Sequence, residues 1–274
     1  MPQFDYIIIG AGSSGCVLAD RLSADGCTTL LLLKAGSDNE TKRVNMPRAL
    51  MKIWDDPRYF WQFPVKAQDR RPAGETWFYG RGLGGSSFTN GTRYMRGEPA
   101  DYDAWHALGL AEWSWAVVER CYRKMECYEA TDAYDGRGRH GSLQVRKLPF
   151  RSHFFGTAIQ AADQMGLLFL PDINTRNRQG IGYSQASVDQ RGRRASACRM
   201  FLKPAMSRPN LKVVTGALVE RVELNEKRAR VVRFRVDDQL EIATCNHEVI
   251  LSTGALQSPK LPRLSGIDPA AVLQ

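Results

Sequence analysis

The chain has 274 residues, of which 43% are hydrophobic and 24% are charged. This composition is ordinary for a globular protein and excludes disordered and collagen-like classes. The net charge of +9 comes from basic residues spread along the chain without an aromatic RNA-binding motif, so it favours attraction of small anions over nucleic acid binding.

The first 34 residues predict a strand–helix–strand unit. Residues 4–9 are a short β-branched and aromatic run that ends at Gly10, residues 16–24 have apolar side chains at helical spacing, and residues 29–33 are a second apolar run. A βαβ unit of this length implies a parallel sheet.

The middle of the chain is less regular. Residues 36–80 contain several prolines and predict irregular structure, and residues 80–91 predict a loop rich in glycine and serine. Helices are expected after Ser114, with apolar residues on one face up to Met125, and over residues 154–165. Residues 135–141 and 171–182 are expected to be loops.

From residue 211 the hydrophobic period changes to two. Residues 218–224, 232–236 and 240–244 predict a three-stranded antiparallel meander, and residues 248–252 predict a separate buried strand. A helix is expected over residues 257–264. Pro262 should interrupt it, because an interior proline removes a hydrogen bond and costs about 3 kcal/mol.

Residues 10–15 fit the pattern G-x-G-x-x-G between a predicted strand and a predicted helix, which indicates a dinucleotide site. Gly10 would permit the tight turn, Gly12 the approach of the pyrophosphate, and Gly15 the close packing of the helix. The acidic residue expected about 20 positions on is replaced by Lys34. A lysine cannot accept hydrogen bonds from ribose hydroxyls, but it can pair with a 2′-phosphate, which would favour NADP, or it can be a substitution in a site for another dinucleotide.

Four stretches carry a resemblance to a known family. They are YIIIGAGSSG at 6–15 with LLLKAG at 31–36, GRGLGGSS at 80–87 continuing to 103, residues 192–202, and GALQSPKL at 254–261 continuing to 267. With these motifs the chain resembles the glucose–methanol–choline (GMC) flavoprotein oxidoreductases, and among them the choline-dehydrogenase-like alcohol dehydrogenases.

The resemblance implies FAD as cofactor, with the pyrophosphate at the glycine motif and Lys34 at the position of the family's ribose-binding glutamate. The segment 81–92 would lie along the flavin and its ribityl-phosphate arm, the backbone of residue 219 would meet the adenine, and residues 253–254 would lie near the phosphates. The implied cofactor-binding residues are Gly10, Gly12, Ser13, Ser14, Gly15, Lys34, Ala35, Arg81, Gly85, Ser86, Asn90, Gly91, Thr92, Val219, Thr253 and Gly254.

The implied fold class is α/β, with a Rossmann-like FAD domain resembling that of glutathione reductase, a β-meander, and the beginning of an incomplete α+β substrate domain. We expect the FAD domain at residues 1–140, with a flavin-covering loop at 75–100, the start of the substrate region at 141–204, and the second part of the FAD domain at 205–274. The meander and the loop at 80–91 favour FAD over NADP.

The implied activity is FAD-dependent oxidation of a small alcohol, with an unidentified electron acceptor. The family's catalytic histidine lies near the C-terminus of a longer chain, and none of the four histidines here matches it, so the catalytic residues are unknown and an N-terminal part is expected. A degenerate or split nucleotide-binding module without redox activity is the alternative.

Neither a membrane span nor a signal peptide is expected, because no apolar run reaches about 18 residues and the N-terminus has no basic segment. The six cysteines contain no C-x-x-C pair, so they predict reduced, mostly buried thiols and no metal site. These features favour a cytoplasmic location.

Overall fold

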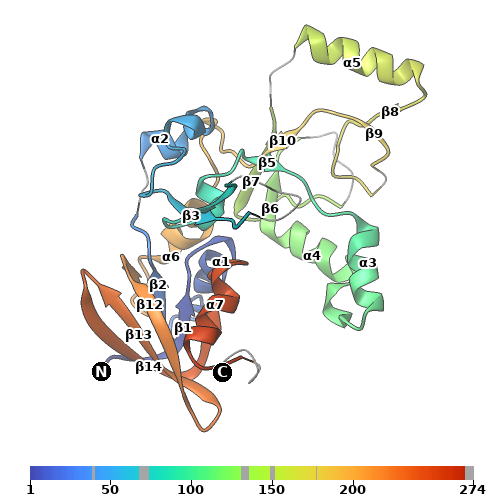
Figure 1. The fold of residues 1–274 in the computed structure, drawn as a ribbon. Coiled ribbons are helices and arrows are strands. Elements are labelled where there is room, and N and C mark those ends of the chain that lie inside the picture. The colour runs from blue at the N-terminus through green and yellow to red at the C-terminus, as the bar shows by residue number, and fades with distance from the viewer. Residues whose placement is uncertain (39–40, 68–73, 131–135, 149–151, 177, 269–274) are drawn as a thin grey trace. The chain divides into compact units, whose positions relative to one another are not determined.

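The computed structural model describes residues 1–38, 41–67, 74–130, 136–148, 152–176 and 178–268. Some residues covered by the predictions lie outside these ranges. They are position 135 of the predicted basic loop, positions 39–40 and 68–73 of the predicted irregular segment, and position 177 of the predicted loop at 171–182. The chain divides into two compact units, Met1–Gly91 with Ser196–Gln274, and Thr92–Ala195 (Figure 1). The functional division predicted at residues 140 and 204 stays a prediction.

The first unit is built on a six-stranded sheet of order β11-β2-β1-β14-β13-β12. β1 (Gln3–Ile9), α1 (Ser13–Leu22) and β2 (Leu30–Lys34) form the predicted βαβ unit, and β11 (Leu211–Thr215) pairs with β2 on its other side. These strands are parallel; β2 is buried along its whole length and the last three residues of β1 are buried, as expected at the centre of a parallel sheet. The predicted α/β class is confirmed.

The meander is also confirmed, with one correction. β12 (Leu218–Asn225), β13 (Arg228–Val236) and β14 (Gln239–Leu251) are antiparallel neighbours. The predicted separate strand at 248–252 is wrong, because β14 is one long strand that pairs with β13 and then, in parallel, with β1. Two residues of β14, Asn246 and His247, lie opposite a single residue of β1, Asp5. These exposed polar residues therefore form a β-bulge within one continuous strand.

The prediction of irregular structure over 36–80 is wrong for about half of the described residues of that segment. It contains α2 (Lys42–Asn45), η1 (Pro47–Lys52), and an antiparallel hairpin of β3 (Phe60–Pro64) and β4 (Thr76–Gly80). Pro64 is tolerated because it ends its strand at the edge of a two-stranded sheet. One face of the hairpin, with Phe60 and Phe78, packs on a small core around Ile53 and Phe88.

Short helices complete the first unit. η2 (Gly85–Phe88) lies in the predicted glycine-rich loop, and η4 (Cys198–Leu202) and α6 (Lys203–Ala205) precede β11. α7 (Gln257–Leu264) packs against β12 and continues through Pro262, so the predicted interruption is wrong. The helix ends two residues later, where the amide of Ser265 bonds to the carbonyls of Leu261 and Pro262, so only one turn lies beyond the lost bond.

The second unit combines a four-stranded sheet of order β5-β10-β7-β6 with helices. The strands are β5 (Arg93–Tyr94), β10 (Gln185–Ala186), β7 (Leu143–Lys147) and β6 (Glu126–Tyr128). The predicted helices are confirmed as α4 (Trp115–Met125) and α5 (His153–Gln164). The remaining elements are α3 (Pro99–Ala107), η3 (Ala111–Trp113), and the parallel pair β8 (Leu168–Phe169) and β9 (Gly180–Ile181), the latter within the predicted loop at 171–182.

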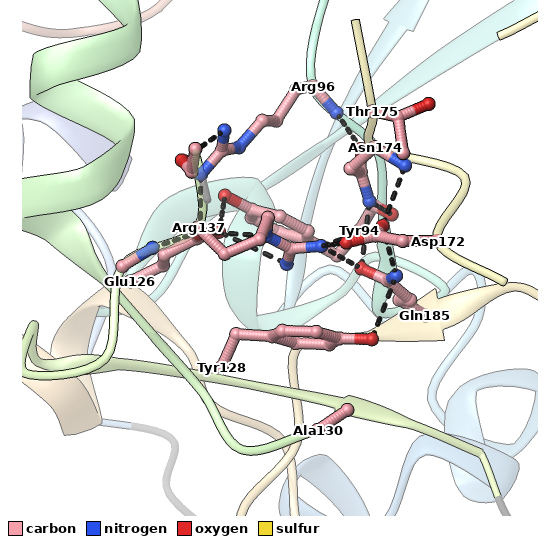
Figure 2. Close-up of polar contacts among 12 residues, drawn as sticks. Tyr94, Arg96, Glu126, Tyr128, Ala130, Arg137, Asp172, Asn174, Thr175 and Gln185 are labelled. Atoms are coloured by element: carbon pink, nitrogen blue, oxygen red, sulfur yellow. Dashed lines mark hydrogen bonds and ion pairs between the residues drawn. The ribbon is translucent and has the colours of Figure 1, made fainter. Parts of the chain in front are cut away.

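A buried ionic network forms the polar core of the second unit (Figure 2). Glu126 is fully buried and forms ion pairs with Arg96 and Arg137, the second at 2.8 Å. Arg137 also pairs with Asp172 at 2.8 Å, and its guanidinium carbon lies 3.7 Å from the ring centroid of Tyr128. Two cations are therefore paired with two anions, so the charges of the cluster are balanced by the chain's own side chains.

The six cysteines are free thiols. Cys16, Cys198 and Cys245 are buried, whereas Cys27 and Cys121 are exposed, so the expectation of mostly buried thiols holds for only half of them. In the described part of the chain, no helix combines the length and the apolar character needed to cross a bilayer.

Candidate dinucleotide site

The first unit contains a groove made of two adjoining cavities at the carboxyl ends of β1, β2 and β14. Their volumes are about 380 Å³ and about 470 Å³, each large enough for a small organic ligand or half of a dinucleotide. The cavities share four lining residues, Lys34, Trp61, Thr253 and Gln257, so they meet at this point. Ligands of open parallel sheets bind at this edge.

The turn after β1 has the geometry that the glycine motif predicts. Gly10 has φ +102°, and a Cβ atom there would lie 2.5 Å from the carbonyl oxygen of Ser252. A Cβ atom at Gly15 would lie 1.8 Å from the carbonyl oxygen of Gly10, so α1 packs directly on the end of the strand. No larger residue fits at either position without moving the backbone.

The N-terminus of α1 faces the smaller cavity. Gly12, Ser13 and Ser14 line it, and both serines are exposed. Among the described residues, no side chain caps this helix, and its first turn contains no acidic residue. The first amides of a helix have no partner within the helix and carry the positive end of its dipole, so they are available to an anion.

The glycine- and serine-rich loop lies against this turn. The amide of Gly84 donates to the carbonyl of Ala11 at 2.8 Å, and a Cβ atom at Gly85 would lie 2.7 Å from the Cα of Gly12. Gly85 has φ +54°, a conformation that favours glycine. Two segments that are far apart in sequence therefore form one continuous backbone wall of the smaller cavity, to which Ser86 also contributes.

Lys34 ends β2 at the junction of the two cavities and is only 9% exposed. Burial lowers the pKa of its ammonium group to about 8, an effect that Cys16 opposes and the nearby charge of Arg81 reinforces. No carboxylate of the described residues forms an ion pair with it. Burial also raises the pKa of the Cys16 thiol to about 12, so this neighbour is neutral at pH 7.

The larger cavity is more apolar. It is lined by the ends of β1 and β2, by the start of β12, and by one face of α7. The predicted residues Gly10, Ala35 and Val219 contribute to it, as do Leu261 and Leu264 of α7. An apolar cavity beside a charged junction and a glycine-rich anion site has the arrangement expected for the base, sugar and phosphate parts of a nucleotide.

The smaller cavity also has an aromatic wall that was not predicted from the sequence. It is formed by Trp61, Phe63 and Tyr79 of the β3–β4 hairpin. Trp61 pairs with Tyr79 across the two strands, so their side chains share a face, opposite to that of Phe60 and Phe78. The aromatic runs FWQF at 60–63 and WFY at 77–79 were the signal that could have revealed this hairpin, because aromatic residues are enriched in strands.

Most of the predicted site residues come together in the groove. Eight line the smaller cavity and five line the larger one, with Lys34 and Thr253 in both. Gly15 and Arg81 lie beneath or beside it without lining either cavity, and Asn90 and Gly91 are exposed. Thr92 belongs to the second unit.

The histidines do not contribute to the groove. All four, His106, His140, His153 and His247, are exposed, and none lines either cavity. Within the described ranges, no three His, Cys, Asp or Glu side chains are placed to hold a metal ion together.

The fold and the groove define a dinucleotide-binding domain of the oxidoreductase type. The family model of the GMC oxidoreductases matches residues 4–272, so the chain belongs to this family, as the sequence resemblance predicted. FAD is the cofactor of that family.

The similar proteins share this assignment. The chain is 38% identical to the oxygen-dependent choline dehydrogenase of Photobacterium profundum and 37% identical to that of Stenotrophomonas maltophilia, over 99% of its length. It spans about half the length of these curated relatives, 48% and 49%. Among solved structures, pyridoxine 4-oxidase from Mesorbium loti matches with a TM-score of 0.91 and 30% identity, covering 98% of this chain and 53% of that one.

Proposed function

We propose that the first unit binds FAD in the two-cavity groove. The observation that carries this proposal is the arrangement of a bare helix N-terminus, two glycine-rich loops in contact, and an apolar cavity along one edge of the parallel sheet. The residues that would hold FAD are the predicted residues that line the two cavities, with the addition of Trp61 and Gln257.

These residues have distinct tasks. The first amides of α1, with the exposed hydroxyls of Ser13 and Ser14, would bind the pyrophosphate. Gly12 and Gly85 keep this wall free of side chains, so that backbone and phosphate can approach closely. Ala35 and Val219 would enclose the adenosine in the larger cavity.

FAD, when bound, supplies an acceptor for the hydride of an alcohol. We propose an alcohol of the choline type as substrate, because relatives with 37–38% identity are choline dehydrogenases. The electron acceptor is not specified by any residue of the groove, and no catalytic residue is assigned. A cytoplasmic location belongs to the same proposal.

Lys34 favours a second candidate function, a nucleotide-binding module without redox activity. A buried cation stands where the resemblance places a ribose-binding glutamate, and a lysine cannot accept the ribose hydrogen bonds that a carboxylate accepts. This substitution would weaken FAD binding while leaving the phosphate-binding turn intact.

FAD titration of the purified chain tests these proposals, with flavin fluorescence anisotropy and the visible absorption spectrum as readouts. We expect saturable binding that Gly12→Val weakens at least tenfold, because the new side chain enters the smaller cavity. The backbone of Gly12 (φ −83°) accepts a side chain and the nearest atom to a Cβ is 3.8 Å away, so this variant should fold.

The matched control is Gly156→Val on α5 of the second unit, where a Cβ atom meets nothing within 4 Å. It should leave FAD affinity unchanged. Equal FAD affinity of the wild type and Gly12→Val would count against the groove. Binding of ADP without binding of FAD would favour the module without redox activity.

A further inference from the structure

We propose that Lys34 makes the ribose position of this groove an anion site, so that an adenine nucleotide with a 2′-phosphate binds more tightly than the same nucleotide with a free 2′-hydroxyl. This inference rests on the proposed function only in that both place the adenosine in the larger cavity. It concerns the chemistry of one subsite, which the resemblance leaves open.

The positive charge of Lys34 is not balanced by an acidic side chain of the described residues. A cation that is nine-tenths buried is normally paired with an acidic side chain, because isolated burial is costly. Here no described carboxylate pairs with Lys34, and it lines both cavities. Its counter-charge has to come from solvent or from a ligand in the groove.

A second basic group lies next to it. The backbone carbonyl of Arg81 lies against Gly36, where a Cβ atom would come within 1.9 Å, so the segment at 81 packs on the residues that follow β2. The Nε of Arg81 is buried without a hydrogen-bond partner among the described residues, and its guanidinium lies 4.7 Å from the ring centroid of Trp61. Two cationic side chains thus meet beside the junction of the cavities.

The other charged groups of the larger cavity do not cancel this excess. Glu220 lines it, but its carboxylate is bound by the Nε of Arg235 at 2.6 Å. Lys260 adds another positive charge. Among the described lining residues the only acidic side chain is therefore already paired, and the potential at the junction is positive.

The position of Lys34 selects the part of the ligand that it meets. In domains of this topology, the residue at the end of the second strand meets the 2′-position of the adenosine ribose, where a carboxylate accepts from a free hydroxyl and a cation accommodates a 2′-phosphate. A phosphate monoester carries a charge of about −1.5 to −2 at pH 7 and three acceptor oxygens, which match an ammonium donor.

The test compares adenosine 2′,5′-bisphosphate with 5′-AMP by isothermal titration calorimetry on the intact chain, with FAD binding measured separately. We expect the bisphosphate to bind at least tenfold more tightly. Lys34→Met should abolish this preference and Lys34→Glu should reverse it. Lys212→Glu, an exposed lysine on β11 outside the groove, gives the same change of net charge as Lys34→Glu and should leave the preference intact.

Equal affinities of the two nucleotides would overturn the inference, even if FAD binds. Absence of nucleotide binding while FAD binds would overturn it as well and leave the proposed function standing. A bisphosphate preference that depends on Lys34 without any FAD binding would support the inference and contradict the proposed cofactor. Circular dichroism of both Lys34 variants shows whether they are folded.

Discussion

The Arg96–Arg137 cluster of the second unit and Lys34 of the first unit are buried cations with opposite surroundings. In the second unit, Arg96 and Arg137 are fully buried and are neutralised by Glu126 and Asp172. In the first unit, Lys34 is almost as deeply buried and has no such partner among the described residues. The difference separates a charge cluster that stabilises the fold from a buried charge that is available to a ligand.

The pKa values reflect this contrast. Burial alone would lower the pKa of Arg137, but hydrogen bonds and charge from Glu126 and Asp172 outweigh it and raise the pKa above its ordinary value. For Lys34, burial dominates and lowers the pKa to about 8. Arg137 is held in its charged form by its partners, whereas the charged form of Lys34 lowers the stability of the folded chain.

The largest effect is expected for Glu126→Gln. It removes the negative charge shared by Arg96 and Arg137, and it replaces with an NH2 group one of the two oxygens that accept from the amide of Gly138 and the hydroxyl of Tyr94. Because two buried cations lose their main partner, we expect a loss of about 3–5 kcal/mol in the free energy of unfolding. Urea denaturation followed by circular dichroism measures it, and an unchanged midpoint would contradict a stabilising role of the network.

The opposite sign is expected for Lys34→Met. Its pKa falls from the ordinary value of 10.5 to about 8 on folding, so neutralising the side chain should stabilise the chain by about 1–3 kcal/mol at pH 7. The folded state binds fewer protons than the unfolded state between these two pKa values, so wild-type stability rises with pH across this window.

The difference between Lys34→Met and the wild type should therefore be largest below pH 8 and should vanish as the pH approaches 10.5. Thermal unfolding of both proteins at pH 7 and pH 10 tests this. Other titrating groups act on both proteins alike, so the difference isolates position 34. A variant that is less stable than the wild type at pH 7 would show that Lys34 has a partner of its own.

The sequence predicted the parts of the fold whose signal is local. The glycine motif and the apolar runs on either side gave the βαβ unit, and period-two patterns gave the meander. The β3–β4 hairpin was missed because its aromatic residues form near-continuous runs without a period of two, and prolines lie close to them in the sequence. The continuity of β14 was missed because the polar bulge at Asn246 and His247 looked like a loop.

Within the site, the residues of the glycine motifs could be predicted because their positions require a particular backbone conformation or a close backbone contact. The ionic network could not, because its paired members are 11 to 35 residues apart and lie on separate loops and strands. The same holds for Trp61, whose place in the groove depends on a hairpin. The identity of Lys34 was visible in the sequence, but its lack of a partner became visible only in the structure.

A smaller effect is expected for Tyr128→Phe. The phenol oxygen of Tyr128 accepts from the amide of Gln185 at 3.2 Å, whereas its ring supports the guanidinium of Arg137. The variant keeps the ring and loses the hydrogen bond from Gln185, so a loss of about 1 kcal/mol is expected from this contact. A loss as large as that of Glu126→Gln would mean that the hydroxyl, rather than the charges, holds the network together.

The smallest effect is expected for Glu223→Gln, which is the matched counterpart of Glu126→Gln. Glu223 on β12 also lies between two arginines, Arg221 at 2.9 Å and Arg233, and the hydrogen bond from Arg233 lowers the pKa of its carboxyl. These arginines are partly exposed, so water replaces the lost partner and salt screens the remaining charges. The urea midpoint should stay within error of the wild type. A fall as large as that for Glu126→Gln would mean that the number of paired arginines, rather than their burial, sets the stability. Burial would then not explain why Lys34 and the ionic network of the second unit differ.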